Sequence, residues 1–365
     1  MKILYAHTSN SDYVRVKKNL GYFDTLNCDI IFFGAFRHGQ KKDSGKNIYK
    51  NVKILYYSKV LKHGLVSVFS FLGYIFNLNK LIRNEKPEII LLTNEELYLS
   101  LFLINKKKTK VIIDAIDALD IRVESSAFIK KILNYIVRYI RGKSDVVVEV
   151  ESFRSERFPQ FTNKTVVIRN TPNIFRMNKA PVNYTDYKDY IYASGSLNEN
   201  INGIETLIDA LDLFNRNSER KIKVLIAGII IGDSLTKKIN NNKFVNFIGS
   251  VSLEESHYLA SNSLAMFAFY KPDRLNFIYA APNKVYESFM LGKPLLINEE
   301  CIISKLCSEK KNGFLSSYND VIKLSKNISD IVYFPNIFLE NLKNDFQVNM
   351  SWGLEQKKWD ILFFN

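Results

Sequence analysis

The sequence contains few cysteines and histidines and no long apolar run. Its 365 residues include three cysteines and four histidines. Three cysteines are too few for a disulfide framework or a zinc site, which favours a reducing compartment. The longest nearly apolar run, residues 64–76, is too short to cross a bilayer. The first residues turn polar too early for a secretory signal. We therefore expect a cytoplasmic protein.

Acidic residues are scarce in the first half of the chain only. Residues 1–171 hold 29 Lys and Arg against 16 Asp and Glu, whereas residues 172–365 hold 22 against 21. A basic half attracts anionic lipid, polyphosphate or nucleic acid. Because no reading helix or stacking platform is recognisable, we expect no nucleic-acid partner. A general enrichment in lysine would not explain the nearly neutral second half.

Short apolar segments alternate with helical segments in both halves. Such alternation predicts parallel sheets with helices on both faces. The predicted strands of the first half are residues 2–6, 29–33, 52–56, 88–92, 110–113, 145–150 and 166–168. Those of the second half are residues 190–193, 223–227, 244–248, 264–268 and 295–297. The fold class is therefore α/β, with two doubly wound, Rossmann-like domains.

The polar stretch Asn170–Asp189 is typical of a linker between domains. We expect an N-terminal domain over residues 1–171 and a C-terminal domain over residues 172–345. The final segment, residues 346–365, is expected to form a helix that crosses back to the first domain. Ligands of such sheets bind outside the carboxyl ends of the strands.

Residues 279–298 combine a loop, a short helix and a buried strand. Pro282 suits the first position of a helix, and Gly292 suits its end. Free N–H groups at the start of a helix favour anions. Lys284 in the first turn suits a phosphate, and Glu287 suits sugar hydroxyls. Glu287 could equally complement the helix dipole while Lys284 is simply solvated.

Two parts of this stretch carry a family resemblance. Residues 282–287 (Pro-Asn-Lys-x-x-Glu) and 290–294 (Met-x-Gly-Lys-Pro) resemble the donor signature of bacterial family 4-like glycosyltransferases with the GT-B fold. The resemblance implies two domains facing a central cleft, with Glu287 on the ribose of a nucleotide-sugar. It also implies that Lys284, Asn283 and the helix-start amides meet the diphosphate. Tyr279 stands where relatives often carry a second glutamate, which leaves the donor-sugar contacts open.

Other segments of the second half resemble the same family. Residues 195–210, beginning Gly195-Ser196, resemble its first donor loop, although relatives often have cations at Ser196 and Asn202. Residues 246–251 resemble the loop that packs on the nucleobase through backbone groups, here with Gly249 and Val251. The segment that contains Tyr270 and Arg274 corresponds to the lining of the sugar pocket. Arg274 could bind phosphate or be an exposed loop residue.

Acidic residues follow the predicted strand at residues 110–113. Relatives often show an Asp-x-His-Asp-like pattern here, and this chain has Ile116 at the histidine position. The resemblance makes Asp117 the first candidate for acid/base catalysis and Asp114 the second. A metal-binding role or plain helix capping would also fit these aspartates. No metal or other cofactor is expected, because GT-B enzymes generally act without one.

The loop after the first predicted strand contains further polar residues. On the acceptor side we place His7, Ser9 and Asn10 in this loop. A lone histidine is also often structural.

We expect a hexosyltransferase that uses a UDP- or GDP-linked sugar. It would extend a lipid-linked or oligosaccharide acceptor in capsule or O-antigen synthesis, as a peripheral protein at the inner face of the cytoplasmic membrane. An anionic membrane surface would bind the basic first domain. Two alternatives remain: a non-catalytic protein that binds sugar nucleotides or polyanions, and a sugar-nucleotide epimerase of the same fold.

Overall fold

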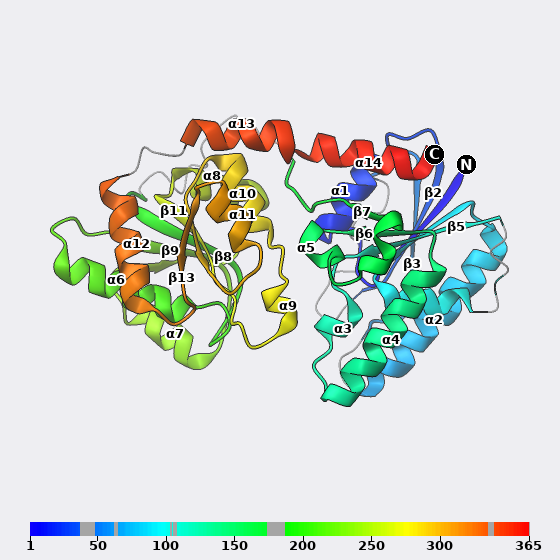
Figure 1. Cartoon of the computed structure of the whole chain (residues 1–365), viewed down its shortest axis with the longest axis horizontal. Coiled ribbons are helices and arrows are strands. Elements are labelled where there is room, and N and C mark those ends of the chain that lie inside the picture. The colour runs from blue at the N-terminus through cyan, green and yellow to red at the C-terminus, as the bar shows by residue number, and fades with distance from the viewer. Residues whose placement is uncertain are drawn as a thin grey trace. The chain divides into compact units, whose positions relative to one another are not determined.

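The structure, a computed structural model, describes residues 1–36, 48–61, 65–102, 104, 108–173, 187–334 and 339–364. The chain divides into two compact units. Unit 1 comprises Met1–Arg169 and Gln356–Asn365, and unit 2 comprises Asn170–Glu355. Each unit contains one parallel sheet covered by helices (Figure 1). Much of the predicted linker, from position 174 to 186, lies outside the described residues.

Unit 1 is built on a seven-stranded sheet in the order β3-β2-β1-β4-β5-β6-β7. Every neighbouring pair is parallel. The order reverses between β1 and β4, which is the switch point at which doubly wound sheets bind ligands. The strands are β1 Lys2–Ala6, β2 Asp29–Gly34, β3 Val52–Tyr56, β4 Ile89–Thr93, β5 Lys110–Ala115, β6 Val146–Glu149 and β7 Thr165–Val167.

Helices cover both faces of this sheet, because successive strand residues point to opposite faces. Leu4 and Ala6 join a core cluster with α2 and α4, whereas Tyr5 contacts Phe23 of α1 on the other face. Phe23 also contacts Trp359 of α14. The helices of unit 1 are α1 Val14–Phe23, α2 Leu65–Glu85, the 3₁₀ helix η1 Glu95–Leu101, α3 Leu119–Arg122, α4 Ala127–Lys143, α5 Ser152–Ser155 and the 3₁₀ helix η2 Pro159–Lys164, with the end of α14 Trp352–Phe364.

Unit 2 contains a six-stranded parallel sheet in the order β10-β9-β8-β11-β12-β13. Its switch point lies between β8 and β11. The strands are β8 Tyr190–Asn198, β9 Lys223–Ile231, β10 Val245–Phe247, β11 Ala265–Ala268, β12 Leu295–Asn298 and β13 Gly313–Ser316. The helices are α6 Ile204–Asn217, α7 Asp233–Asn240, α8 Leu253–Asn262, α9 Leu275–Ile278, α10 Asn283–Leu291, α11 Ser304–Glu309, α12 Val321–Tyr333 and α13 Leu339–Asn349.

The predicted fold class of two doubly wound α/β domains is confirmed. Some elements differ from the prediction. Strands β8 and β9 each continue for several residues beyond their predicted ends and stay paired as far as Asn198 and Ile231. The segment between β4 and β5 contains a 3₁₀ helix, Glu95–Leu101. Strand β13 had not been predicted.

A buried ion pair joins α1 to β5 in unit 1. Nε and Nη2 of Arg15 donate to the two carboxylate oxygens of Asp114 over 3.0 and 2.5 Å. The two side chains are 1% and 0% exposed. Arg15 also reaches the carbonyl of Ile168 after β7. Such a pair is a weak source of net stability, but removing one partner leaves a buried charge uncompensated.

We expect Asp114→Ala to lower the free energy of unfolding by about 3–5 kcal/mol, because Arg15 would stay buried without its partner. Chemical denaturation followed by circular dichroism measures this loss. The exposed Asp12→Ala is the control and should leave stability nearly unchanged. The paired change Arg15→Met with Asp114→Leu should recover much of the loss. A single variant as stable as the parent would contradict this account.

Candidate functional site

Three glycines allow close contact between backbone segments towards the carboxyl ends of β8, β9 and β10 in unit 2. They are Gly195 in β8, Gly228 in β9 and Gly249 after β10. Gly195 pairs with Gly228 across the two longer strands. A Cβ on Gly228 would lie 2.0 Å from the carbonyl oxygen of Gly195, and its φ of +125° also favours glycine. The N–H of Gly228 donates to the carbonyl of Gly249 over 2.7 Å. Only glycine permits this close approach, which leaves a surface of bare backbone.

The side chain of Lys284 comes to this glycine surface from α10. Its Nζ lies 3.3 Å from the position that a Cβ on Gly195 would take. Pro282 stands at the start of the helix, which has no side-chain cap, and the start of a helix favours an anion. Burial lowers the pKa of Lys284, and the charge of Glu287 opposes that shift. The structure thus unites residues 195 and 284, which lie far apart in the sequence.

Glu287 lies one turn further along α10 and faces a buried histidine. Nε2 of His257, on α8, is 3.6 Å from Oε1 of Glu287. His257 is 4% exposed. Burial raises the pKa of the Tyr270 hydroxyl, and the nearby charges of Cys301 and Glu287 add to the rise. Sequence reasoning missed His257, because no motif surrounds it.

Asn298 holds the backbone of Tyr270. The N–H of Tyr270 donates to Oδ1 of Asn298 over 2.8 Å, and Nδ2 of Asn298 donates to the carbonyl of Tyr270 over 3.0 Å. Nδ2 of Asn170 likewise donates to Oδ1 of Asn283 over 2.8 Å. These amide contacts join the residues before and after α10 to each other and the first residue of α10 to Asn170.

The other residues of unit 2 that the sequence connected with donor binding differ in their surroundings. Ser196 is exposed in β8 and pairs with Ile229, so the predicted donor loop begins as a strand. Oδ1 of Asn202 accepts the N–H of Asn198, which gives this residue a role within the loop. Val251 is half-buried and precedes Ser252, the N-cap of α8. Arg274 is 43% exposed, and its guanidinium lies 5.4 Å from the ring centre of Phe277. Its role with phosphate stays a prediction.

The two candidate acidic residues of unit 1 differ in their surroundings. Asp114 is fully buried against Arg15, as described above, so this side chain is structural and out of contact with solvent. Asp117 lies past the end of β5 and is half-buried. Its N–H donates to Oδ1 of Asn94 over 2.9 Å. Asp117 therefore remains the candidate for acid/base chemistry, and Asp114 supports the strand that leads to it.

The three candidates on the acceptor side lie in a tightly packed loop. His7, Ser9 and Asn10 are 4%, 1% and 5% exposed. The N–H of Ser9 donates to Nδ1 of His7 over 2.9 Å. This bond orients the imidazole, whose ring centre lies 5.0 Å from that of Tyr13. The loop follows β1 at the same edge of the sheet as Asp117, since β1, β4 and β5 are parallel neighbours.

The described residues contain no group of three His, Cys, Asp or Glu side chains arranged to hold a metal ion. Of the two aspartates for which a metal had been considered, Asp114 is buried in its ion pair with Arg15.

Comparison with known proteins agrees with this geometry. Residues 188–333 match the family model described as glycosyl transferases group 1. This segment contains Gly195, Lys284 and Glu287. The resemblance to GT-B glycosyltransferases of family 4 that the motifs indicated is confirmed by this match and by the fold. No curated protein matches the sequence significantly.

Several solved structures share the fold of the whole chain at low identity. The lipopolysaccharide outer core galactosyltransferase WaaB is 14% identical with a TM-score of 0.66, and the alignment covers 100% of this chain and 99% of WaaB. HepE from Anabaena, solved with UDP, is 12% identical with a TM-score of 0.72 and 99% coverage of both chains. The UDP-GlcNAc 2-epimerase from Methanocaldococcus jannaschii is 12% identical with a TM-score of 0.63 and 100% coverage of both. These likenesses show the fold alone.

We expect Glu287→Ala to weaken binding of a nucleotide-sugar by ~1.5–3 kcal/mol, because the ribose hydroxyls would lose a charged acceptor. Isothermal titration calorimetry with UDP- and GDP-sugars measures the change. Glu309→Ala, an exposed glutamate of α11 in the same unit, is the matched control. Equal affinities for Glu287→Ala and the parent would remove Glu287 from the site.

Proposed function

We propose that this chain, whose second unit matches the group 1 glycosyltransferases, transfers a hexose from a UDP- or GDP-linked donor to a lipid-linked glycan at an anionic membrane surface. The observation that carries the proposal is the convergence of Lys284, Glu287 and the glycine surface at Gly195 within the matched unit. A diphosphate needs a cation and free N–H groups, and a ribose needs an acceptor for its hydroxyls. All of these groups lie on or beside the first two turns of α10.

The electrostatics of Lys284 suit an anionic ligand. Burial disfavours the charged ammonium and lowers its pKa. A diphosphate beside Nζ would favour the charged form and raise the pKa again. The donor would therefore add negative charge to that of Glu287 beside this ammonium. HepE, solved with UDP, supports a nucleotide of this class by its fold only.

In unit 1 we assign the proton transfer to Asp117. During transfer, the bond between the sugar carbon and the diphosphate oxygen breaks, and an acceptor hydroxyl oxygen bonds to that carbon. The hydroxyl proton passes to a carboxylate, which is the role of a general base. The alternative functions require no such step: a binding protein leaves the donor intact, and an epimerase changes the sugar without an acceptor.

We expect Asp117→Asn to retain donor binding and to lower turnover by roughly 100-fold or more, the usual scale for a lost acid/base group. Product formation is measured with a labelled donor and an extracted lipid-linked acceptor. Asp29→Asn, at the opposite edge of the same sheet, is the control. Full turnover in Asp117→Asn would return this side chain to a structural role. Epimerised donor without acceptor consumption would favour the epimerase.

The membrane part of the proposal is supported by α4. On one face of this helix Val137 and Ile140 are buried, and Ile140 joins the core cluster of the sheet. A second face is exposed and apolar, and Phe128 and Tyr135 on it are 73% and 72% exposed. Covering the sheet accounts for the first face only. The exposed large apolar residues of α4 are Phe128, Ile129, Ile132, Tyr135, Ile136 and Tyr139.

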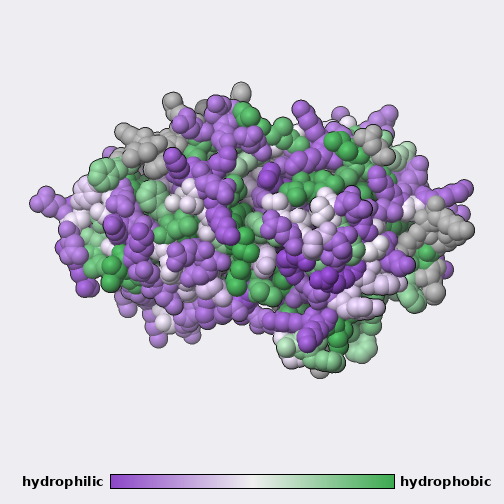
Figure 2. Space-filling view, in the orientation of Figure 1, coloured by the Kyte–Doolittle hydropathy of each residue, from purple (hydrophilic) through white to green (hydrophobic). Residues whose placement is uncertain are grey.

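Helix α2 has the same two-sided character. Tyr74, Leu78 and Ile82 are buried in the same core cluster that α4 joins. The large apolar residues exposed on α2 are Val68, Phe69, Leu72 and Phe76. Figure 2 shows hydrophobic surface at the lower end of unit 1, where Figure 1 places the start of α4. Exposed apolar surface of this kind marks an interaction site.

The charges of α4 suit an anionic surface. The helix sequence contains five Lys and Arg and no Asp or Glu. Lys130, Lys131 and Arg138 are exposed among the apolar residues. An apolar face with cationic flanks is the composition of an interfacial helix. No described helix has the length and hydropathy that a membrane crossing requires.

We expect the protein to float with vesicles that contain anionic lipid and to detach at high salt, because each cation near the surface contributes about 1 kcal/mol and salt screens it within about 8–10 Å. The variant Phe128→Ser with Tyr135→Ser should bind less. Phe334→Ser, which changes an exposed aromatic of unit 2, should behave as the parent. Binding that ignores lipid charge and salt, or no binding, would favour a soluble acceptor.

A further inference from the structure

The loop that follows β5 and carries Asp117 is held by its main chain. The N–H of Asp117 donates to Oδ1 of Asn94 over 2.9 Å, and the N–H of Leu119 donates to Oε2 of Glu95 over 3.2 Å. Both acceptors come from the residues directly after β4. Among the described residues, the carboxylate of Asp117 has no hydrogen-bond partner. The loop is therefore fixed while this carboxylate stays available.

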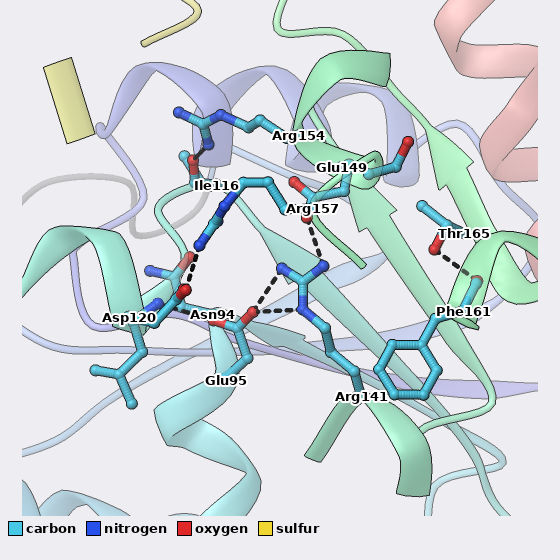
Figure 3. A network of polar contacts seen from close by, with 12 residues as sticks. Asn94, Glu95, Ile116, Asp120, Arg141, Glu149, Arg154, Arg157, Phe161 and Thr165 are labelled. Atoms are coloured by element: carbon cyan, nitrogen blue, oxygen red, sulfur yellow. Dashed lines mark hydrogen bonds and ion pairs between the residues drawn. The ribbon is translucent and has the colours of Figure 1, made fainter. Parts of the chain in front are cut away.

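Buried charges make the support behind this loop rigid. Arg141 donates to Oε1 of Glu95 over 3.0 and 2.8 Å, and its other terminal nitrogen lies 2.6 Å from Oε1 of Glu149 (Figure 3). All three side chains are 0% exposed. On the other flank, Arg154 donates to the carbonyl of Ile116. A paired buried charge cannot move without leaving another uncompensated, so these elements keep their places.

Asn94 has a backbone conformation that asparagine rarely adopts. Its φ is 63° and its ψ is 161°, a region that is essentially restricted to glycine. Its side chain is 7% exposed, and its N–H donates to the carbonyl of Asp114 over 2.9 Å. Strain of this kind persists only where the surroundings hold it, and it gathers at functional sites. A glycine would adopt this backbone freely but would have no carboxamide.

We propose that Asn94 is a positioning residue for Asp117: its strained backbone directs the carboxamide over the end of β5, where it binds the Asp117 N–H and sets the direction of that carboxylate. This inference rests on the proposed function, in which Asp117 takes the acceptor proton. Asn94 itself touches no reacting atom. A side-chain oxygen is needed at position 94 to accept the Asp117 N–H. This need explains why the residue is asparagine, although glycine would relieve the backbone strain.

Three variants separate positioning from stability. Asn94→Gly relieves the strain and removes the acceptor, Asn94→Ala keeps the strain and removes the acceptor, and Asn94→Asp keeps an acceptor. We expect a higher thermal midpoint for the glycine variant than for the alanine variant. We expect both to lose about 10-fold or more in kcat, since small misplacements of a catalytic group are costly. Asn94→Asp should recover most of the turnover, and donor affinity should stay unchanged throughout.

Amide hydrogen exchange, measured without substrate, tests the restraint directly. We expect the Asp117 amide to exchange at least about 10-fold faster in Asn94→Gly, since it loses its only described acceptor. The Gly228 amide, bonded within unit 2, should be unaffected. Unchanged exchange at Asp117 would overturn the proposal. So would a full kcat in Asn94→Gly, or kcat values that merely follow the thermal midpoints.

The same data separate this inference from the proposed function. Faster exchange in Asn94→Gly together with full turnover in Asp117→Asn would refute the catalytic role of Asp117 and uphold the restraint on the loop. Normal exchange in Asn94→Gly together with lost turnover in Asp117→Asn would refute the restraint on the loop and uphold the catalytic role of Asp117.

Discussion

Parallel pairing forces all strands of each sheet to end at one edge, and the candidate sites of both units depend on this constraint. In unit 1 it brings the loops after β1, β4 and β5 together, although residues 7, 94 and 117 are distant in the sequence. In unit 2 it aligns Gly195 with Gly228. Polar residues that follow buried strands thereby become neighbours in space, although no short stretch of sequence contains both partners of such a contact.

The two units stabilise this edge by different physical means. Unit 1 uses charge: Asp114 is neutralised by Arg15, and Glu95 and Glu149 share Arg141, all out of reach of water. Each buried charge is costly alone and tolerable when paired, so the arrangement is well determined. Unit 2 uses the absence of side chains, because glycines let two backbones and a lysine side chain approach closely. The first solution suits a fixed carboxylate, and the second suits an incoming polyanion.

Exposed apolar residues on two helices are a separate feature of unit 1. Helices α2 and α4 each present one apolar face to the sheet and another to solvent. An apolar face in water is unfavourable, and this is the physical reason why we propose a partner for the exposed residues. The basic residues set among them indicate what kind of surface that partner has. Five of the 29 Lys and Arg in residues 1–171 lie in α4.

The sequence by itself determined the fold class, most strands and the segment at residues 282–294, because strand periodicity, glycine and proline are local signals. It ranked Asp117 before Asp114 only through the family resemblance. The burial of Asp114 against Arg15, which distinguishes the two side chains, is a property of the folded chain. The sequence could not indicate His257, Asn94 or the extension of β8 along β9, because these depend on partners from distant segments. The burial of Glu95 likewise depends on a distant partner, Arg141, 46 positions later. Tertiary structure decided which polar residues are buried supports and which remain available for chemistry, because burial and pairing are properties of the folded chain.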